Sequence, residues 1–225
     1  MNTPFWQSVL AITRKDLRAE LRSRELVNSM GLFALLSVLI FSFALELDRV
    51  ARQEAISGVL WVTVVFASVL GLNRSMAMER EQGSLDALLL APISRGAIFC
   101  GKLLANFLFT LVVGLLLLPL MTVLYNMPLL QPWILVVLLL GTAGFSTIGT
   151  LLAAMTVQTR ARESLLPIVM LPVALPVLLS VVRASTAILN AAPIDDWIAW
   201  PQILLVVDVI YLTLCFLLFE YAIEG

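Results

Sequence analysis

The sequence has no histidine among its 225 residues, and its only cysteines are Cys100 and Cys215. A chain without imidazole lacks the commonest general base of enzymes and the commonest metal ligand. Both cysteines border or lie within apolar runs, where a free thiol packs as a small hydrophobic side chain, so we expect no disulfide. The GxxxxGKS/T, HExxH and GxSxG motifs are also absent from the sequence. We therefore expect a chain that is not an enzyme, with no catalytic residue, bound metal or bound cofactor.

Charge is scarce as well. Charged residues make up 13% of the chain and hydrophobic residues 61%, and the net charge is −1. A soluble domain contains about a quarter charged residues, so this balance indicates an integral membrane protein. The near-neutral net charge leaves no basic footprint for nucleic acid.

Long apolar runs fill most of the chain. A helix needs roughly 20 mostly apolar residues to cross the hydrocarbon core of a lipid bilayer. Six segments meet that requirement, at residues 26–47, 55–72, 98–125, 133–157, 164–182 and 203–219. They leave no room for a separate soluble domain. We predict that residues 1–225 form a single all-α transmembrane domain.

Lysine and arginine are unevenly distributed between the two sets of predicted loops. Eleven of the fourteen fall in the N-terminal segment or in loops on the same side of the membrane. Cytoplasmic loops are enriched in these residues, so both termini are expected in the cytoplasm. Four tryptophans suit the opposite, outer interface: Trp61, Trp133, Trp197 and Trp200. The outer loop 184–202 is consistent either with a short surface helix capped by Asp195 and Asp196 or with a solvated loop.

Residues 4–24 have the pattern of an amphipathic helix that lies on the inner leaflet, with Pro4 in the first turn. Apolar residues recur at spacings of three to five, at Phe5, Val9, Ile12, Leu17 and Leu21. A basic stripe follows at steps of four, at Arg14, Arg18 and Arg22. This combination is typical of interfacial helices. The helix would serve either only as an anchor for orientation or as a lever between the first span and a moving partner.

A charged segment, EREQGSLDALLLAPISR from Glu79 to Arg95, separates the second and third spans on the predicted cytoplasmic side. It is too polar to cross a membrane and too apolar for a free linker. We expect Ser75 to cap a short helix with acids near its first turn, where the helix dipole favours them. Gly83 would then permit a bend, and Pro92 would end a second short helix.

This element, residues 75–95, is predicted to dock on a protein outside the membrane through a leucine face. The alternative is a solvated charged loop, but such a loop gains nothing from three consecutive leucines. The residues expected at the docking surface are Glu79, Arg80, Glu81, Gln82, Gly83, Ser84, Leu85, Asp86, Leu88, Leu89 and Pro92.

Two further features lie inside predicted spans. The fifth span contains Pro167, Pro172 and Pro176, which bend a helix and free backbone carbonyls. Carbonyl groups freed by proline need hydrogen-bond partners within a membrane, so this span is expected to face protein or a cavity. The bend is either static, or it acts as a hinge or as a cavity wall. Asp208 lies in the first turns of the sixth span, and an intramembrane carboxylate is a candidate functional residue. Its expected position near the outer end equally suits a water-facing role.

Three blocks of the sequence resemble the haem exporter protein B family (CcmB) of cytochrome c maturation. The most specific is GVLWVTVVFASVLGLNRSMAMEREQGSLDALLLAPISR at residues 58–95, followed by GKLLANFLF at 101–109. The third is GTAGFSTIGTLLAAMTVQTRARESLLPIVMLPVALPVLL at 141–179. Residues before the first span and in the last span resemble the family only in their general residue type and not in specific motifs.

The resemblance implies the membrane subunit of an ATP-binding-cassette transporter, with six spans of the type-2 exporter fold, in the inner membrane of a bacterium. Residues 79–92 would be its coupling element, docked on a separate cytoplasmic ATPase subunit that works as a dimer and binds the ATP. A polytopic haem-handling subunit, a small single-span subunit and a periplasmic haem chaperone would complete the system. Haem would be the transported substrate.

Three readings of the function remain open at this point. Haem passes through this chain without an imidazole ligand from it, or the chain only transmits ATPase motion to a haem-handling partner as a non-transporting scaffold. The third reading is a generic lipid, drug or polysaccharide exporter permease that acts as a homodimer.

Overall fold

A computed structural model describes residues 4–45, 49–81, 93–156 and 162–224 of the chain. The regular secondary structure of these residues is entirely helical. The helices are α1 (Phe5–Ser23), α2 (Glu25–Ala44), α3 (Arg49–Glu81), α5 (Arg95–Tyr125), α6 (Pro132–Thr156), α7 (Arg162–Leu189), α8 (Ile194–Trp197) and α9 (Ala199–Glu224).

Six stretches of the described helices are long and apolar enough to cross a membrane, which confirms the predicted number of spans. They are Glu25–Ala44, Ala55–Ser75, Arg95–Tyr125, Pro132–Thr156, Ser164–Leu189 and Ile194–Ala222. Several run beyond the predicted ends, because polar residues at a helix terminus continue the backbone hydrogen bonds after the apolar run has stopped. The fifth span, for example, continues from residue 182 to Leu189.

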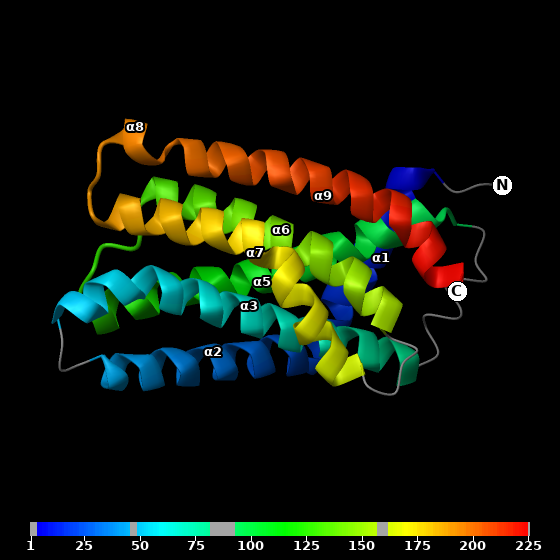
Figure 1. The fold of residues 1–225 in the computed structure, drawn as a ribbon. Helices are drawn as coiled ribbons and strands as arrows, with labels where there is room; N and C mark the ends of the chain where they lie inside the picture. Colours follow the sequence, from blue (N-terminus) through cyan, green and yellow to red (C-terminus); the bar gives the residue numbers. More distant parts are fainter. Residues whose placement is uncertain (1–3, 46–48, 82–92, 157–161, 225) are drawn as a thin grey trace.

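The spanning helices form an elongated bundle in which α6 is central. It packs against α7 and α9, and also against α5 and α3. The helices α2 and α9 lie at opposite edges of the bundle and keep most of their side chains on the outside (Figure 1). By contrast, α3 and α6 are mostly buried within the chain. Small residues on α6 make this close packing possible: a Cβ atom at Gly141 would meet the Trp61 ring at 2.5 Å.

Trp61 is buried within the bundle and does not present its ring at the surface of the chain, where an interfacial anchor would lie. Its side chain is 1% exposed, and its indole Nε1 donates a hydrogen bond to Ser185 Oγ at 2.9 Å. The ring also lies 6.1 Å from that of Phe145. The tryptophan therefore joins α3, α6 and α7 in the interior, where its N–H has the partner that a buried indole requires.

The connection between α7 and α9 contains the short helix α8, so the expectation of a short surface helix in this loop is the correct one. The two aspartates lie in its first turn, but the N-cap residue is Pro193 and no side chain caps the helix. Trp197 is buried here and packs edge to face against Trp133, with ring centroids 5.1 Å apart.

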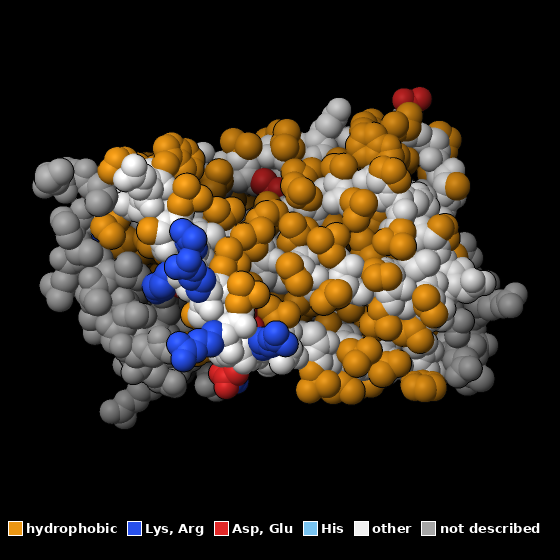
Figure 2. Space-filling view, turned by 180° about the vertical axis from the view of Figure 1, so that it is seen from behind, with side chains coloured by type: hydrophobic (Ala, Val, Ile, Leu, Met, Phe, Trp, Pro, Cys, Tyr) orange, Lys and Arg blue, Asp and Glu red, His pale blue; other side chains and the backbone are white. Residues whose placement is uncertain are grey.

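The two ends of the bundle differ. One end carries α8, the last turn of α2, the first turn of α3 and the turn that joins α5 to α6 (Figure 1). The other end carries α1, the last turn of α9, the last turns of α3 and the start of α5 (Figure 1). The face seen in Figure 2 is mostly hydrophobic, and its lysine and arginine side chains gather toward one end. We refer to the end with α1 as the α1 end.

Candidate functional site

The predicted docking residues lie only partly within the described chain. Glu79, Arg80 and Glu81 form the last turn of α3. The others lie outside the described residues: Gln82, Gly83, Ser84, Leu85, Asp86, Leu88, Leu89 and Pro92. Ser75 is not an N-cap, because α3 runs through it without a break. Residues 73–81 contain no glycine or proline and several strong helix formers, so nothing in the sequence ends the helix at residue 75.

The two helices that flank residues 82–92 are each tied to the N-terminal part of the chain. On the α3 side, Arg74 forms an ion pair with Glu25 in the first turn of α2, with Arg74 Nη2 and Glu25 Oε2 3.0 Å apart. Both side chains are about half exposed, so the pair adds little to stability by itself. It nevertheless fixes which part of α2 lies beside the end of α3.

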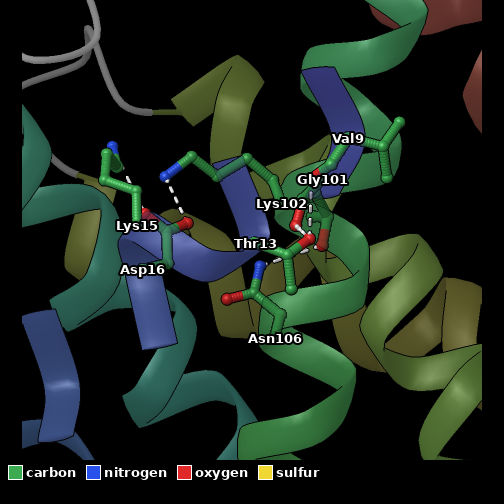
Figure 3. Close-up of polar contacts among 8 residues, drawn as sticks. Val9, Thr13, Lys15, Asp16, Gly101, Lys102 and Asn106 are labelled. Atoms are coloured by element: carbon green, nitrogen blue, oxygen red, sulfur yellow. Dashed lines mark hydrogen bonds and ion pairs between the residues drawn. The ribbon is translucent and has the colours of Figure 1, made fainter. Parts of the chain in front are cut away.

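On the α5 side, α1 is seated directly on the helix backbone at Gly101. A Cβ atom there would lie 2.8 Å from Ile12 Cβ, so only glycine allows this approach. The Thr13 hydroxyl lies 3.1 Å from the Gly101 carbonyl oxygen and 3.0 Å from that of Val9, and it donates its proton to these two acceptors (Figure 3). The buried threonine thus joins α1 to α5 with its hydrogen-bonding capacity used.

A buried ion pair lies next to this contact. Lys102 of α5 is 2% exposed, and its Nζ atom donates to Asp16 Oδ2 of α1 at 2.8 Å (Figure 3). Lys15 Nζ lies 3.2 Å from the other carboxylate oxygen of Asp16. A buried charge of this kind is expensive unless it is paired, so α1 must be in place whenever Lys102 is buried.

The role of Lys102 was not predicted, because the residue is one of the eleven basic residues expected on the cytoplasmic side. The available signal was its position, since Lys102 falls inside the predicted span 98–125, where a cation requires a partner.

The join between α1 and α2 is also fixed by side-chain contacts. Glu20 is buried, and its carboxylate accepts hydrogen bonds from the backbone N–H groups of Leu26 at 3.2 Å and Val27 at 2.8 Å. These are otherwise unpaired donors at the start of α2, where the helix dipole also favours an acid. Arg24 between the two helices has φ 56°, in the left-handed region. A turn in this region followed by a capped helix start sets the angle between α1 and α2.

The apolar residues of α1 do not form a single outward face. Val9 and Ile12 are buried, and Ile12 lies against Gly101 of α5, whereas Leu21 is 75% exposed. The amphipathic pattern read from residues 4–24 therefore arises in part from packing on the protein itself.

The three prolines of the fifth span all lie within α7, and the helix changes direction along its length (Figure 1). Pro172 and Pro176 are exposed on the outward side of the helix. The inward side is formed by Leu166, Met170, Ala174, Val177 and Val181. The rings thus lie away from the core of this chain.

Asp208 lies further along its helix than predicted. Helix α9 begins at Ala199, so Asp208 falls in its third turn, and its carboxylate faces Gly144 of α6. Both carboxylate oxygens are buried, and neither has a hydrogen-bond partner among the described residues. A Cβ atom at Gly144 would overlap Asp208 Oδ1 and lie 3.1 Å from Val177 Cγ2. The carboxylate thus occupies the space that the missing side chain of Gly144 leaves between α6, α7 and α9.

The structure brings some of these features together and keeps others apart. The α3 end, the start of α5, α1 and the start of α2 form one connected group at the α1 end. Asp208 and the α7 prolines belong to the α6, α7 and α9 side of the bundle, whereas α1 packs mainly on α5. Within the described chain, no three acidic, cysteine or histidine residues are grouped so that they would hold a metal ion.

Comparison with known proteins identifies the relatives of this chain. The family model described as "CcmB protein" matches residues 7–224. A protein of Rhodobacter capsulatus named "Heme exporter protein B" is 35% identical over 173 residues, which cover 75% of this chain and 78% of that protein. Proteins of the same name from Pseudomonas aeruginosa and Paracoccus denitrificans are 30% and 31% identical, over 80% and 75% of this chain and 80% and 78% of their own lengths. The resemblance seen in the three sequence blocks is thereby confirmed, and the chain belongs to the CcmB protein family.

Proposed function

We propose that this chain is the membrane subunit of an ATP-binding-cassette complex that exports haem, or releases it to a periplasmic haem chaperone, during cytochrome c maturation. The observation that carries the proposal is the family match over residues 7–224, since the matched relatives are named as haem exporters. The six apolar helices suit a transporter component and not an enzyme. Haem is then the substrate, and a separate cytoplasmic ATPase dimer supplies the energy.

In this proposal, the protein is a six-span permease of the type-2 exporter class in the bacterial inner membrane, with both termini in the cytoplasm. The uneven distribution of lysine and arginine supports this orientation. The grouping of α1 with the last turn of α9 at one end of the bundle is consistent with it. Helix α1 then lies at the inner membrane interface, and α8 lies on the outer side.

Residues 75–95 are the coupling element in this proposal and dock on the ATPase. The contacts of the flanking helices support a route by which motion would leave that element. The ion pair of Arg74 with Glu25 links the end of α3 to α2, and the ion pair of Lys102 with Asp16 links the start of α5 to α1. Glu20 closes the group by joining α1 to α2. A displacement of the connection between α3 and α5 would therefore move four helices together.

The α7 and α9 side of the bundle is the proposed side for the second polytopic subunit. The exposed Pro172 and Pro176 give α7 an irregular outward face, which suits contact with protein better than contact with lipid. Pro167, Pro172 and Pro176 then act as a hinge or cavity wall, and Asp208 acts as an intramembrane polar site nearby. The small single-span subunit completes the membrane part of the complex.

One observation favours the scaffold reading as a second candidate. The chain contains no histidine, so haem that passed through it would receive no imidazole ligand from it. In this reading, the chain transmits ATPase motion and the polytopic partner alone handles haem. A generic exporter homodimer is distinguished from both by its composition, because it would purify with an ATPase but without a haem-handling subunit.

The test is haem movement by the purified complex in sealed vesicles. We expect ATP-dependent appearance of haem, or of haem-loaded chaperone, on the side opposite the ATPase. ATP hydrolysis and chaperone loading without any haem flux would contradict transport through this chain and support the non-transporting scaffold. ATP hydrolysis with neither product would contradict both readings.

The coupling element has its own test in Gly83→Val and Asp86→Lys. Both variants are expected to insert normally and to lose ATP-driven cytochrome c maturation while ATP hydrolysis continues. Asp195→Asn, at an exposed position of α8, is the control and should mature cytochrome c normally. Normal maturation in both coupling variants would contradict the assigned role of residues 75–95.

A further inference from the structure

The face of α1 that points away from α5 carries apolar and basic side chains together. Trp6 is 71% exposed and Leu10 62% exposed, and both lie near the start of the helix. Arg14, Arg18 and Arg22 continue the same stripe at steps of four and are all exposed. Residues four apart lie one above another on a helix, so these five side chains form one continuous strip. We call this strip the outward strip of α1.

The acids of this region are all engaged in contacts within the chain. Asp16 is paired with Lys102 and Lys15, Glu20 caps α2, and Glu25 is paired with Arg74.

The arginines of the same region are not neutralised in this way. Arg14, Arg18, Arg22 and Arg24 form no ion pair in the part of the chain that the structure describes. The contacts that seat α1 on α5 and α2 therefore turn its acids inward and leave its outer surface positive, although the whole chain has a net charge of −1.

The positive surface adjoins an extensive apolar one. In Figure 2 the lysine and arginine side chains gather toward one end, and hydrophobic side chains cover most of the described remainder of that face. A ligand for the outward strip must therefore offer negative charge and apolar surface side by side.

We propose that the outward strip of α1 is a binding site for anionic phospholipid headgroups. Each guanidinium group presents a fork of donors that fits a phosphate, and the indole and leucine side chains enter the adjacent acyl region. The inference rests on the position of α1 at the membrane interface in the proposed function. It adds the chemical class of the lipid and the residues that select it.

A phospholipid fits the strip better than an acidic soluble protein does. An acidic protein could form ion pairs with Arg14, Arg18 and Arg22, but it would also have to cover the exposed Trp6 and Leu10. An anionic bilayer surface supplies phosphate and hydrocarbon at adjacent depths, which is where tryptophan and arginine are both favoured.

The test measures retention of phosphatidylglycerol by the full chain in nanodiscs of phosphatidylcholine with a minority of phosphatidylglycerol. The test variant replaces Arg14, Arg18 and Arg22 with glutamine. A matched variant replaces the same three with lysine, and Arg183→Gln is the control for loss of an exposed arginine elsewhere. Relative affinity for the two lipids is read by native mass spectrometry or by exchange of spin-labelled lipid.

We expect the preference for phosphatidylglycerol to fall about fivefold for each arginine lost, in the single variants as well as in the triple variant. The lysine variant should keep most of the preference, Arg183→Gln should leave it unchanged, and added salt should reduce it in the wild type. The single substitutions keep the test valid if the triple glutamine variant does not fold.

Two results would overturn the proposal. One is an unchanged lipid preference in the triple glutamine variant. The other is a triple variant that loses capture of the ATPase subunit in detergent while its lipid preference is unaltered, which would identify the strip as a protein-docking surface. The assay contains neither ATP nor haem, so its failure would leave the proposed transport function untouched.

Discussion

Lys102 and Asp208 are both charged residues inside spanning helices, and their surroundings differ. Lys102 is buried with its ammonium group 2.8 Å from Asp16, so its charge is answered within the chain. The carboxylate of Asp208 is also buried, but it has no hydrogen-bond partner among the described residues. The first is a closed joint that holds α1 on α5. The second is a polar group whose need for a partner is not met by the described chain.

The largest effect on stability is expected when the buried ion pair between Lys102 and Asp16 is removed. Lys102→Met leaves Asp16 partly buried, with Lys15 as its ion-pair partner among the described residues, and we expect it to cost about 3–5 kcal/mol of folding free energy. Equilibrium unfolding of the purified chain in mixed micelles measures this loss. Adding Asp16→Leu to the same chain should restore most of it, because an apolar pair removes the unpaired charge. A double variant as unstable as the single one would contradict the buried pair.

A second variant fills the space that the Asp208 carboxylate occupies. Gly144→Ala places a methyl group against this carboxylate and against Val177, and we expect a loss of about 1–3 kcal/mol from overpacking. The same micelle assay applies. In the background of Asp208→Ala the cost should shrink, because the flexible end that the methyl group meets is gone. Equal costs in both backgrounds would show that the contact between α6 and α9 does not depend on Asp208.

A third change should act in the opposite direction. Asp208→Leu removes a buried acid that lacks a partner in the chain, so we expect the isolated protein to gain about 1–2 kcal/mol. Within the assembled complex the same change is expected to lower maturation of cytochrome c, because the partner group loses its acceptor. A Leu variant that is less stable as an isolated chain would show that Asp208 already has a partner within it.

The smallest effect is expected at the join between α1 and α2. Glu20→Ala removes the side chain that caps the start of α2, and caps of this kind contribute about 1 kcal/mol. Thermal unfolding should detect this change. Glu20→Gln keeps an acceptor oxygen for one of the two N–H groups and should recover part of the loss. A Gln variant as destabilised as the Ala variant would indicate that the charge matters more than the hydrogen bond.

The transmembrane layout was predictable because it depends on local properties of the sequence. A run of about 20 apolar residues has few alternatives to a membrane span, and all six runs became helices. The end of α3 was predicted wrongly, because a change from apolar to polar residues after residue 72 does not by itself end a helix. Composition changes there, but no glycine or proline interrupts the helix before Glu81.

The contacts of the candidate site were not predictable, because they join residues that are far apart in the sequence. Lys102 and Asp16 are separated by 86 positions, and neither position shows which partner it meets. Trp61 illustrates the same limit. An indole near the end of an apolar run is typical of a membrane interface. Trp61 can be buried instead because Ser185 on α7 accepts the hydrogen bond of its indole N–H. The face of α1 that packs on protein was also hidden, because leucine and isoleucine pack equally well on lipid and on another helix.

The seat of α1 on α5 has a consequence for how the chain is made. Helix α1 leaves the ribosome first, but Gly101 and Lys102, which receive it, follow more than 80 residues later. At about 5–20 residues per second, this delay lasts several seconds. During that time α2 and α3 enter the bilayer while Asp16 and Thr13 remain at its surface without their final partners. The arrival of α5 therefore completes the N-terminal half of the protein, and a nascent chain that stops before residue 101 would carry α1 as an undocked helix.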